Sequence, residues 1–130
     1  MKSANPKQGK IRVLLALPLL YMLLIFYVSS LAGGSLQTGV SVSDKLLHFL
    51  EYAVLSALLY TAFRGGLGLR PKQAHWLSIL LAVVYGASDE WHQSFVPGRD
   101  MSIYDWYADC LGAIAAQALI YIGRVARRRR

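Results

Sequence analysis

The chain has 130 residues, 55% of them hydrophobic and 16% charged, and its formal net charge is +7. Soluble domains carry about 25% charged residues, so this balance excludes an ordinary soluble domain and is typical of a one-domain integral membrane protein. The basic excess does not indicate nucleic-acid binding, because no aromatic and basic surface pattern accompanies it. Cys110 is the one cysteine, which excludes a disulfide framework within the chain.

The first predicted membrane span follows a basic start. Residues 1–12 contain four basic residues and no acid, and residues 13–32 contain no charge. About twenty apolar residues, each rising ~1.5 Å, cross a hydrocarbon core of ~30 Å, so we expect a retained helix. A cleaved secretory signal peptide is the alternative, because it has the same basic start and Ser30-Leu31-Ala32 resembles a cleavage site.

The second predicted span, residues 45–63, follows a short polar connector at 33–43. Asp44, His48 and Glu51 are separated by four and three residues. This spacing places the three side chains on one face of a helix. The second span therefore carries a polar stripe at its beginning.

The third predicted span, residues 73–93, follows a basic loop at 64–72. Only residues 73–88 are free of formal charge, which is too short a stretch to cross a membrane. We therefore expect the helix to continue through the charged residues at 89–92.

The fourth predicted span, residues 103–123, follows a tight connector at 94–102 that contains the turn signal Pro97-Gly98. Asp105 and Asp109 lie one helical turn apart near its beginning. The sequence thus predicts an all-α membrane bundle of four helices with short connectors. Its parts are a basic N-terminus at 1–12, a four-helix transmembrane domain at 13–123 and a basic tail at 124–130.

The basic residues also predict the orientation. Twelve of the 14 lysines and arginines flank the membrane on one side, and only Lys45 and Arg99 fall on the other. The positive-inside rule therefore places both termini of this multi-pass protein in the cytoplasm. All seven acids then lie toward the outer face of the cell membrane.

The outer ends of the second, third and fourth predicted spans thus share a set of polar side chains. Such side chains are costly at membrane depth and indicate a functional site, because burial requires pairing and hydrogen bonding. The candidates for catalysis are His48, Glu51, Asp89, Glu90, His92, Asp105 and Asp109. The candidates for ligand binding are Asp44, Lys45, Gln93 and Arg99.

Three uses are compatible with these residue types. Carboxylates and imidazoles are ligands of Zn²⁺, Mn²⁺ or Mg²⁺, but no closed motif such as H-E-x-x-H is present, so the metal stays an open question. Acid–base catalysis would use His48 or His92 beside a carboxylate, because histidine titrates near neutral pH. An interhelical network of ion pairs, with Lys45 or Arg99 neutralising the acids, is the structural alternative.

Three segments resemble the motifs of a known family. They are D-K-L-L-H-F-L-E-Y at 44–52, D-E-W-H-Q-S-F-V-P-G-R-D at 89–100 and D-W-Y-A-D-C-L-G at 105–112. In this order and spacing they resemble the VanZ-like family of small bacterial membrane proteins, over roughly residues 43–112. The resemblance implies a small helical bundle in the cell envelope and a link to glycopeptide (teicoplanin) sensitivity. The family's activity is not settled, so the resemblance supplies no reaction, and whether the chain is an enzyme stays open.

The leading functional hypothesis is a cell-envelope protein that binds or modifies a lipid-linked or peptidoglycan-related ligand at the outer leaflet. The depth of the polar set suits a lipid head group, whose phosphate Lys45 and Arg99 could hold. A non-catalytic structural partner of an envelope complex is an alternative. The basic tail is expected either to contact anionic lipid of the inner leaflet or to act only as a topology anchor.

A proton-coupled transporter or channel is a further alternative, because intramembrane acids and histidines are common in such proteins. It requires a polar path through the inner halves of the spans. We expect only scattered polar groups there: Ser56, Tyr60, Thr61, Ser78 and Gln117. His75 is expected to lie at the interface without a role.

Overall fold

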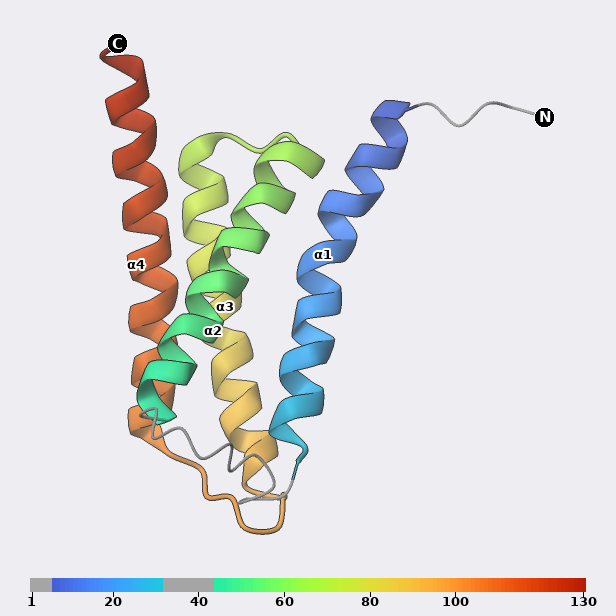
Figure 1. The fold of residues 1–130 in the computed structure, drawn as a ribbon, viewed down its shortest axis with the longest axis vertical. Coiled ribbons are helices and arrows are strands. Elements are labelled where there is room, and N and C mark those ends of the chain that lie inside the picture. The colour runs from blue at the N-terminus through green and yellow to red at the C-terminus, as the bar shows by residue number, and fades with distance from the viewer. Residues whose placement is uncertain (1–5, 32–43) are drawn as a thin grey trace, which may run out of the picture.

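The computed structural model describes residues 6–31 and 44–130, and the regular elements in these ranges are all helices (Figure 1). They are α1 (Pro6–Ser29), α2 (Asp44–Thr61), the short π-helix η1 (Ala62–Gly66), α3 (Pro71–Gln93) and α4 (Ile103–Arg128). The predicted all-α fold of four long helices is confirmed. The predicted connector at 33–43 and the first five residues of the basic N-terminus lie outside the described residues.

Three of the long helices are long and apolar enough to cross a membrane. They are α1 over Lys7–Ser29, α2 with η1 over Asp44–Gly66, and α4 over Ile103–Arg128. The fourth, α3, has a sufficient length of 23 residues but ends in the acids Asp89 and Glu90. The crossing of the membrane by α3 therefore stays a prediction.

Two helices are longer at their basic ends than the sequence predicts. Helix α1 begins at Pro6 rather than at residue 13, and α4 continues to Arg128 rather than ending at residue 123. Lysine and arginine are good helix formers, and proline is favourable in the first helical turn. Basic residues in the last turn of α4 also stabilise the negative end of the helix dipole. The uncharged apolar run predicts the membrane span, but it does not predict where the helix extends into the flanking basic residues.

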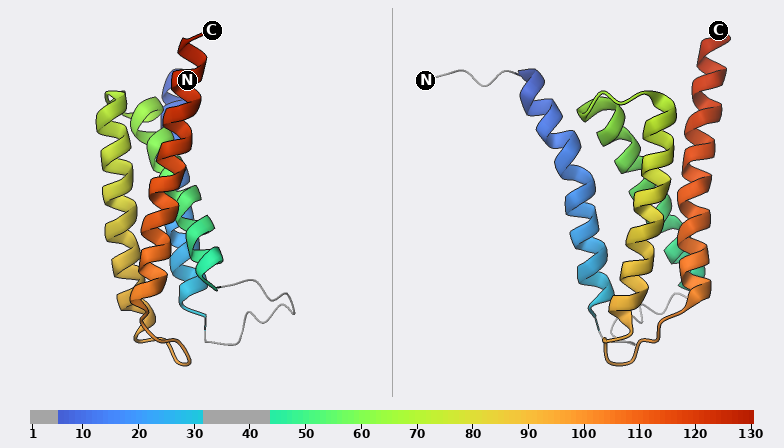
Figure 2. Two further views of the ribbon diagram at one scale, coloured as in Figure 1. Left: turned by 90° about the vertical axis from the view of Figure 1, so that its left-hand side faces the viewer. Right: turned by 180° about the vertical axis from the view of Figure 1, so that it is seen from behind.

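Successive helices run in opposite directions, so the start of α1, the η1–α3 connection and the end of α4 share one end of the bundle (Figures 1 and 2). We call this the basic end, because most lysines and arginines belong to it. The other end, the acidic end, holds the start of α2 and the 94–102 connector. All seven acids lie in the half of the bundle that is nearer to this acidic end.

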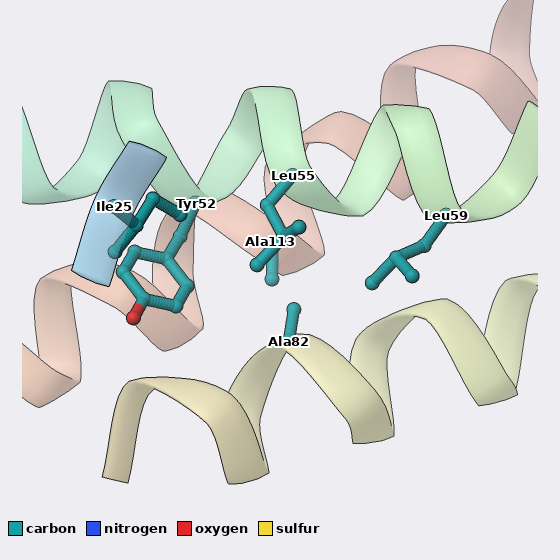
Figure 3. Packing of buried hydrophobic residues seen from close by; sticks show 6 residues of the cluster. All are labelled: Ile25, Tyr52, Leu55, Leu59, Ala82 and Ala113. Carbon is teal, nitrogen blue, oxygen red and sulfur yellow. The ribbon is translucent and has the colours of Figure 1, made fainter. Parts of the chain in front are cut away.

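Side chains from all four long helices form the apolar core (Figure 3). Its buried members are Ile25, Tyr52, Leu55, Leu59, Ala82 and Ala113. The outer surface of α1 is also apolar, since Leu19, Leu20 and Leu23 are 61%, 61% and 64% exposed. An apolar surface of this kind suits lipid and would favour aggregation in water.

Helices α2 and α4 approach each other very closely at Gly112. A Cβ atom on Gly112 would lie 2.0 Å from the backbone oxygen of Phe49, so a side chain has no room there. Small residues at helix interfaces let two backbones come together in this way. This close approach brings the polar starts of α2 and α4 side by side.

We expect Gly112→Ala to destabilise the protein by about 1–3 kcal/mol, because the added methyl group would force α2 and α4 apart. Gly123→Ala is the matched control in the same helix, since a Cβ there meets nothing within 4 Å. This control should be neutral or stabilising by up to about 1 kcal/mol. Unfolding of both variants in detergent, followed by circular dichroism, would measure the difference, and equal stability would contradict the close contact.

Candidate functional site

Three buried ionisable side chains meet at the acidic end, one from each of α2, α3 and α4. His48 Nδ1 lies 2.9 Å from Asp109 Oδ1 and 3.9 Å from Glu90 Oε1. His48 is 4% exposed, Glu90 is 3% exposed and Asp109 is fully buried. We call these three residues the His48 cluster. Its 2.9 Å contact is a buried hydrogen bond between two helices that are far apart in the sequence.

Two carboxylate oxygens of the His48 cluster have no hydrogen-bond partner among the described residues. Glu90 Oε2 accepts a hydrogen bond of 2.7 Å from the backbone N–H of Ser102, whereas Glu90 Oε1 accepts none. Asp109 Oδ2 is likewise unpartnered, and a Cβ atom on Gly86 would lie 2.9 Å from it. Buried polar atoms are nearly always hydrogen-bonded, so these oxygens mark where a ligand, an ion or a proton would be stabilising.

A more exposed pair lies at the rim of the His48 cluster. Lys45 Nζ lies 3.3 Å from Asp105 Oδ1, and the Lys45 side chain is 58% exposed. Asp105 is held by the cap of α4, where its backbone N–H donates to Ser102 Oγ. Asp44, His48 and Asp105 also offer ligand atoms within 4.8 Å of one another. The exposed charge of Lys45 therefore lies beside the buried His48 cluster.

A second group of predicted residues forms hydrogen bonds that link the end of α1 with α3 and with the 94–102 connector. Gln93 Nε2 donates to Asp89 Oδ2 over 3.0 Å and to Ser29 Oγ over 3.4 Å. Arg99 donates through Nε to the backbone oxygen of Leu31 over 3.1 Å and through Nη1 to Gln93 Oε1 over 3.4 Å. We call Asp89, Gln93 and Arg99 the Arg99 group.

His92 and Glu51 lie apart from these contacts. His92 Nε2 is 3.0 Å from Ser30 Oγ, and its ring stacks on Phe26 with 4.5 Å between the ring centroids. Glu51 is half-buried and makes no hydrogen bond or ion pair within the described residues, but it lies close enough to His48 and Asp89 to interact with both electrostatically. The sequence predicts one shared site, but the contacts divide its members between the His48 cluster with its rim and the α1 contacts.

Sequence reasoning missed two residues at the acidic end. The Tyr52 hydroxyl is buried and has no hydrogen-bond partner within residues 6–31 and 44–130, and Tyr52 lies one helical turn after His48 on the same face. Ser102 caps α4 and orients Glu90 through its backbone N–H. The i+4 spacing could have indicated Tyr52, and a serine three residues before Asp105 could have indicated the cap.

Three of the five polar groups predicted to be scattered in the other half are connected, which corrects the sequence prediction for Ser56, Tyr60 and Gln117. The other two donate hydrogen bonds to the backbone of their own helices. Gln117 Nε2 donates to Ser56 Oγ over 2.8 Å, and Gln117 Oε1 lies 2.7 Å from His75 Nδ1. The ring of Tyr60 packs on His75 with 4.5 Å between the centroids. His75 therefore belongs to a polar network that includes Ser56 and Gln117. The sequence gives no signal for it, because its members come from three different helices.

The fold and the His48 cluster define a helical membrane protein with ionisable side chains buried at one end of its bundle. The chain belongs to the VanZ/LLP1 family, whose sequence pattern matches residues 5–124, nearly the whole chain. This match confirms the resemblance of the three motif segments and extends it to the first helix.

One relative is an uncharacterised protein of the yeast Schizosaccharomyces pombe. It is 29% identical to this chain over 98 residues, which cover 75% of the chain and 58% of the yeast protein. The chain thus spans less than two thirds of the length of this relative. No solved structure matches the chain.

Proposed function

We propose that this protein lies in the cell membrane with its acidic end outward and binds or modifies a lipid-linked ligand of the cell envelope there. The observation that carries this proposal is the His48 cluster with its two unpartnered carboxylate oxygens. A purely structural ion-pair network would be expected to satisfy such atoms, because an unpaired buried polar group costs about 1–3 kcal/mol. A binding site accounts for them better.

The distribution of charge supports this orientation. Eleven of the 13 basic residues that the structure describes belong to the basic end, and the other two, Lys45 and Arg99, belong to the acidic end. By the positive-inside rule, the basic end and both termini face the cytoplasm. The His48 cluster then lies at the outer leaflet, at a depth that suits a lipid head group.

We propose different roles for the predicted binding residues, based on their contacts. Lys45 lies exposed at the rim, so its ammonium could move from Asp105 to a phosphate. Arg99 is bonded to Leu31 and Gln93, so we assign it to holding the end of α1. His48 beside Asp109 forms a pair that can transfer a proton during acid–base chemistry.

The relative from yeast bears on the chemistry of the ligand. A lipid phosphate is common to the membranes of both bacteria and yeast, so we favour it as the recognised group. An effect on glycopeptide sensitivity would follow where the lipid phosphate belongs to a peptidoglycan precursor.

A proton-coupled transporter or channel is the second candidate, favoured by the polar network around His75. On α2, Tyr52 and Leu55 separate His48 from Ser56 within the apolar core. On α4, Ala113 separates Asp109 from Gln117 in the same way. This apolar layer between the two polar regions favours a one-sided binding site over a continuous path.

Cysteine accessibility tests the orientation. In a Cys110→Ser background, Ser35→Cys should react with a membrane-impermeant thiol reagent in intact cells, and Leu67→Cys should react only after the cells are opened. Leu67 is 54% exposed and lies just after η1 at the basic end, so burial would not hide it. The reverse pattern of labelling would show that the protein is inverted.

Ligand binding tests the function. The purified protein in lipid nanodiscs should bind a short-chain polyisoprenyl phosphate and should not bind the corresponding uncharged alcohol. His48→Gln and Glu90→Gln should each weaken binding about 10–100-fold, because a hydrogen bond to a charged group contributes about 1.5–3 kcal/mol. Asp100→Asn is the matched control, since Asp100 is exposed and outside the His48 cluster.

The results distinguish the candidate functions. Turnover of the phosphate that is lost in folded His48→Gln would indicate an enzyme, and binding without turnover would indicate a recognition module. Proton flux into proteoliposomes that depends on His48 would support the transporter instead. Equal affinity for the phosphate and the alcohol would contradict the proposed function.

A further inference from the structure

The geometry points to a divalent-cation site formed by His48 Nδ1, Asp109 Oδ1 and Glu90 Oε1. The cation would supply positive charge at the site to which we assign a phosphate ligand, so this inference rests on the proposed function for its biological use. The binding of the metal itself can be tested independently of any phosphate.

The distances between the three side chains fit a shared ion. Ligand atoms about 2.1 Å from a tetrahedral metal lie about 3.4 Å from one another. His48 Nδ1 is 2.9 Å from Asp109 Oδ1 and 3.9 Å from Glu90 Oε1, which brackets this separation. The three residues offer ligand atoms that all lie within 4.8 Å of one another. Small shifts of the three side chains would complete the site.

The unpartnered oxygen of Glu90 is an independent indication of a ligand. Glu90 is only 3% exposed, and in the part of the chain that the structure describes Oε1 has no hydrogen-bond partner, although it lies 3.9 Å from His48 Nδ1. The backbone N–H of Ser102 holds the other oxygen at 2.7 Å. Such outer-shell hydrogen bonds orient carboxylates toward the metals that they bind.

The charge of the His48 cluster also favours a cation. Two buried carboxylates, Asp109 and Glu90, face one imidazole. Lys45 lies at the rim, where it pairs with Asp105 rather than with these two acids. Buried charges need a counter-charge, and a divalent ion would neutralise both acids at once. The same ion would attract an anionic phosphate that the acids alone would repel.

The ligand types indicate which metals would bind. One imidazole and two carboxylates suit Zn²⁺ or Mn²⁺ better than Mg²⁺, which prefers oxygen ligands alone. Three protein ligands leave one tetrahedral position open, as in catalytic rather than structural zinc sites. That open position is where a phosphate oxygen or a water molecule would bind.

Metal binding to the full chain tests this inference. Protein purified through a tag without histidine and stripped with a chelator should bind one equivalent of Zn²⁺ or Mn²⁺ by isothermal titration and gain thermal stability. His48→Gln and Glu90→Gln should each weaken binding at least about a hundredfold, because losing an outer-shell partner alone costs about 10–100-fold. His92→Gln and Asp100→Asn are the matched controls and should bind like wild type.

Wild-type spectra keep the test decisive if the variants fail to fold. Co²⁺ bound by this ligand set should give the visible absorption of four-coordinate cobalt, and its absence would overturn the inference. Equal loss in His48→Gln and His92→Gln would also overturn it. Phosphate-lipid binding that survives chelation would reject the metal but keep the proposed function, whereas metal binding without lipid binding would do the reverse.

A second inference concerns the groove between α3 and α4 at the basic end, which has a volume of about 690 Å³. We infer that it binds the head group of an anionic phospholipid. Four cationic side chains line it, and its lining includes no acid: Arg70, Lys72, Arg124 and Arg128. The remaining wall is largely apolar and includes Trp76, Ile79 and Ile114, which suits an acyl chain.

Contacts with neighbouring side chains hold the polar groups of the groove in place. Arg124 donates a hydrogen bond to the Tyr60 hydroxyl, and its guanidinium lies 5.9 Å from the centre of the Tyr60 ring. His75, which also lines the groove, is bonded to Gln117. These contacts place the positive charge beside an apolar wall, as a phospholipid requires.

Matched charge removal separates this site from general attraction to the membrane. In native mass spectrometry, the wild type should retain phosphatidylglycerol in preference to phosphatidylcholine. Arg124→Gln with Arg128→Gln should reduce this retention at least about tenfold. Arg129→Gln with Arg130→Gln removes the same charge outside the groove and should leave it unchanged. Equal loss in both double variants, or no preference for phosphatidylglycerol, would overturn the inference.

Discussion

The contact between His48 and Asp109 fixes the acidic end of the molecule, because it lies beside the close approach of α2 and α4 at Gly112. Phe49 follows His48 directly, and its backbone oxygen leaves no room for a side chain at Gly112, one turn beyond Asp109. Helix approach and side-chain contact are therefore parts of the same feature. Glu90 from α3 completes the cluster, and Gly86 on α3 leaves the space that Asp109 occupies.

The two ends of the bundle treat charge in opposite ways. At the acidic end, Asp109 and Glu90 are buried among three helices and face one imidazole. At the basic end, arginines line an open groove with apolar walls. The apolar core separates the two ends (Figure 3). This division supports the proposed function, in which the acidic end binds a ligand and the basic end contacts lipid head groups.

The four long helices and the gathering of the acids at one end of the bundle could be predicted from the sequence, because hydropathy and the distribution of charge mark long apolar helices and their ends. Helical spacing also placed His48 and Glu51 on one face. Spacing did not show that His48 would contact Asp109, whereas Glu51 would make no hydrogen bond or ion pair within the described residues. That outcome depends on the rotation of α2 against α4, which the local sequence does not encode.

The adjacent acids of α3 show the same limit. Asp89 and Glu90 are about 100° apart around the helix, so one binds Gln93 near α1 and the other faces His48. A sequence reading could only group them. The network of His75 with Gln117 was missed for the same reason, because its members become neighbours only when α3 packs on α4.

The most direct test of the account is a double-mutant cycle between His48→Ala and Asp109→Ala, measured by reversible unfolding in detergent. Removing one partner of a buried ion pair costs about 3–5 kcal/mol, because the other charge is left uncompensated. The double variant should lose much less stability than the sum of the losses of the two single variants. The same cycle for Lys45 and Asp105 should give a coupling below about 1 kcal/mol, because Lys45 is 58% exposed. Additive losses for His48 and Asp109, within about 0.5 kcal/mol, would contradict the cluster on which the proposed site depends.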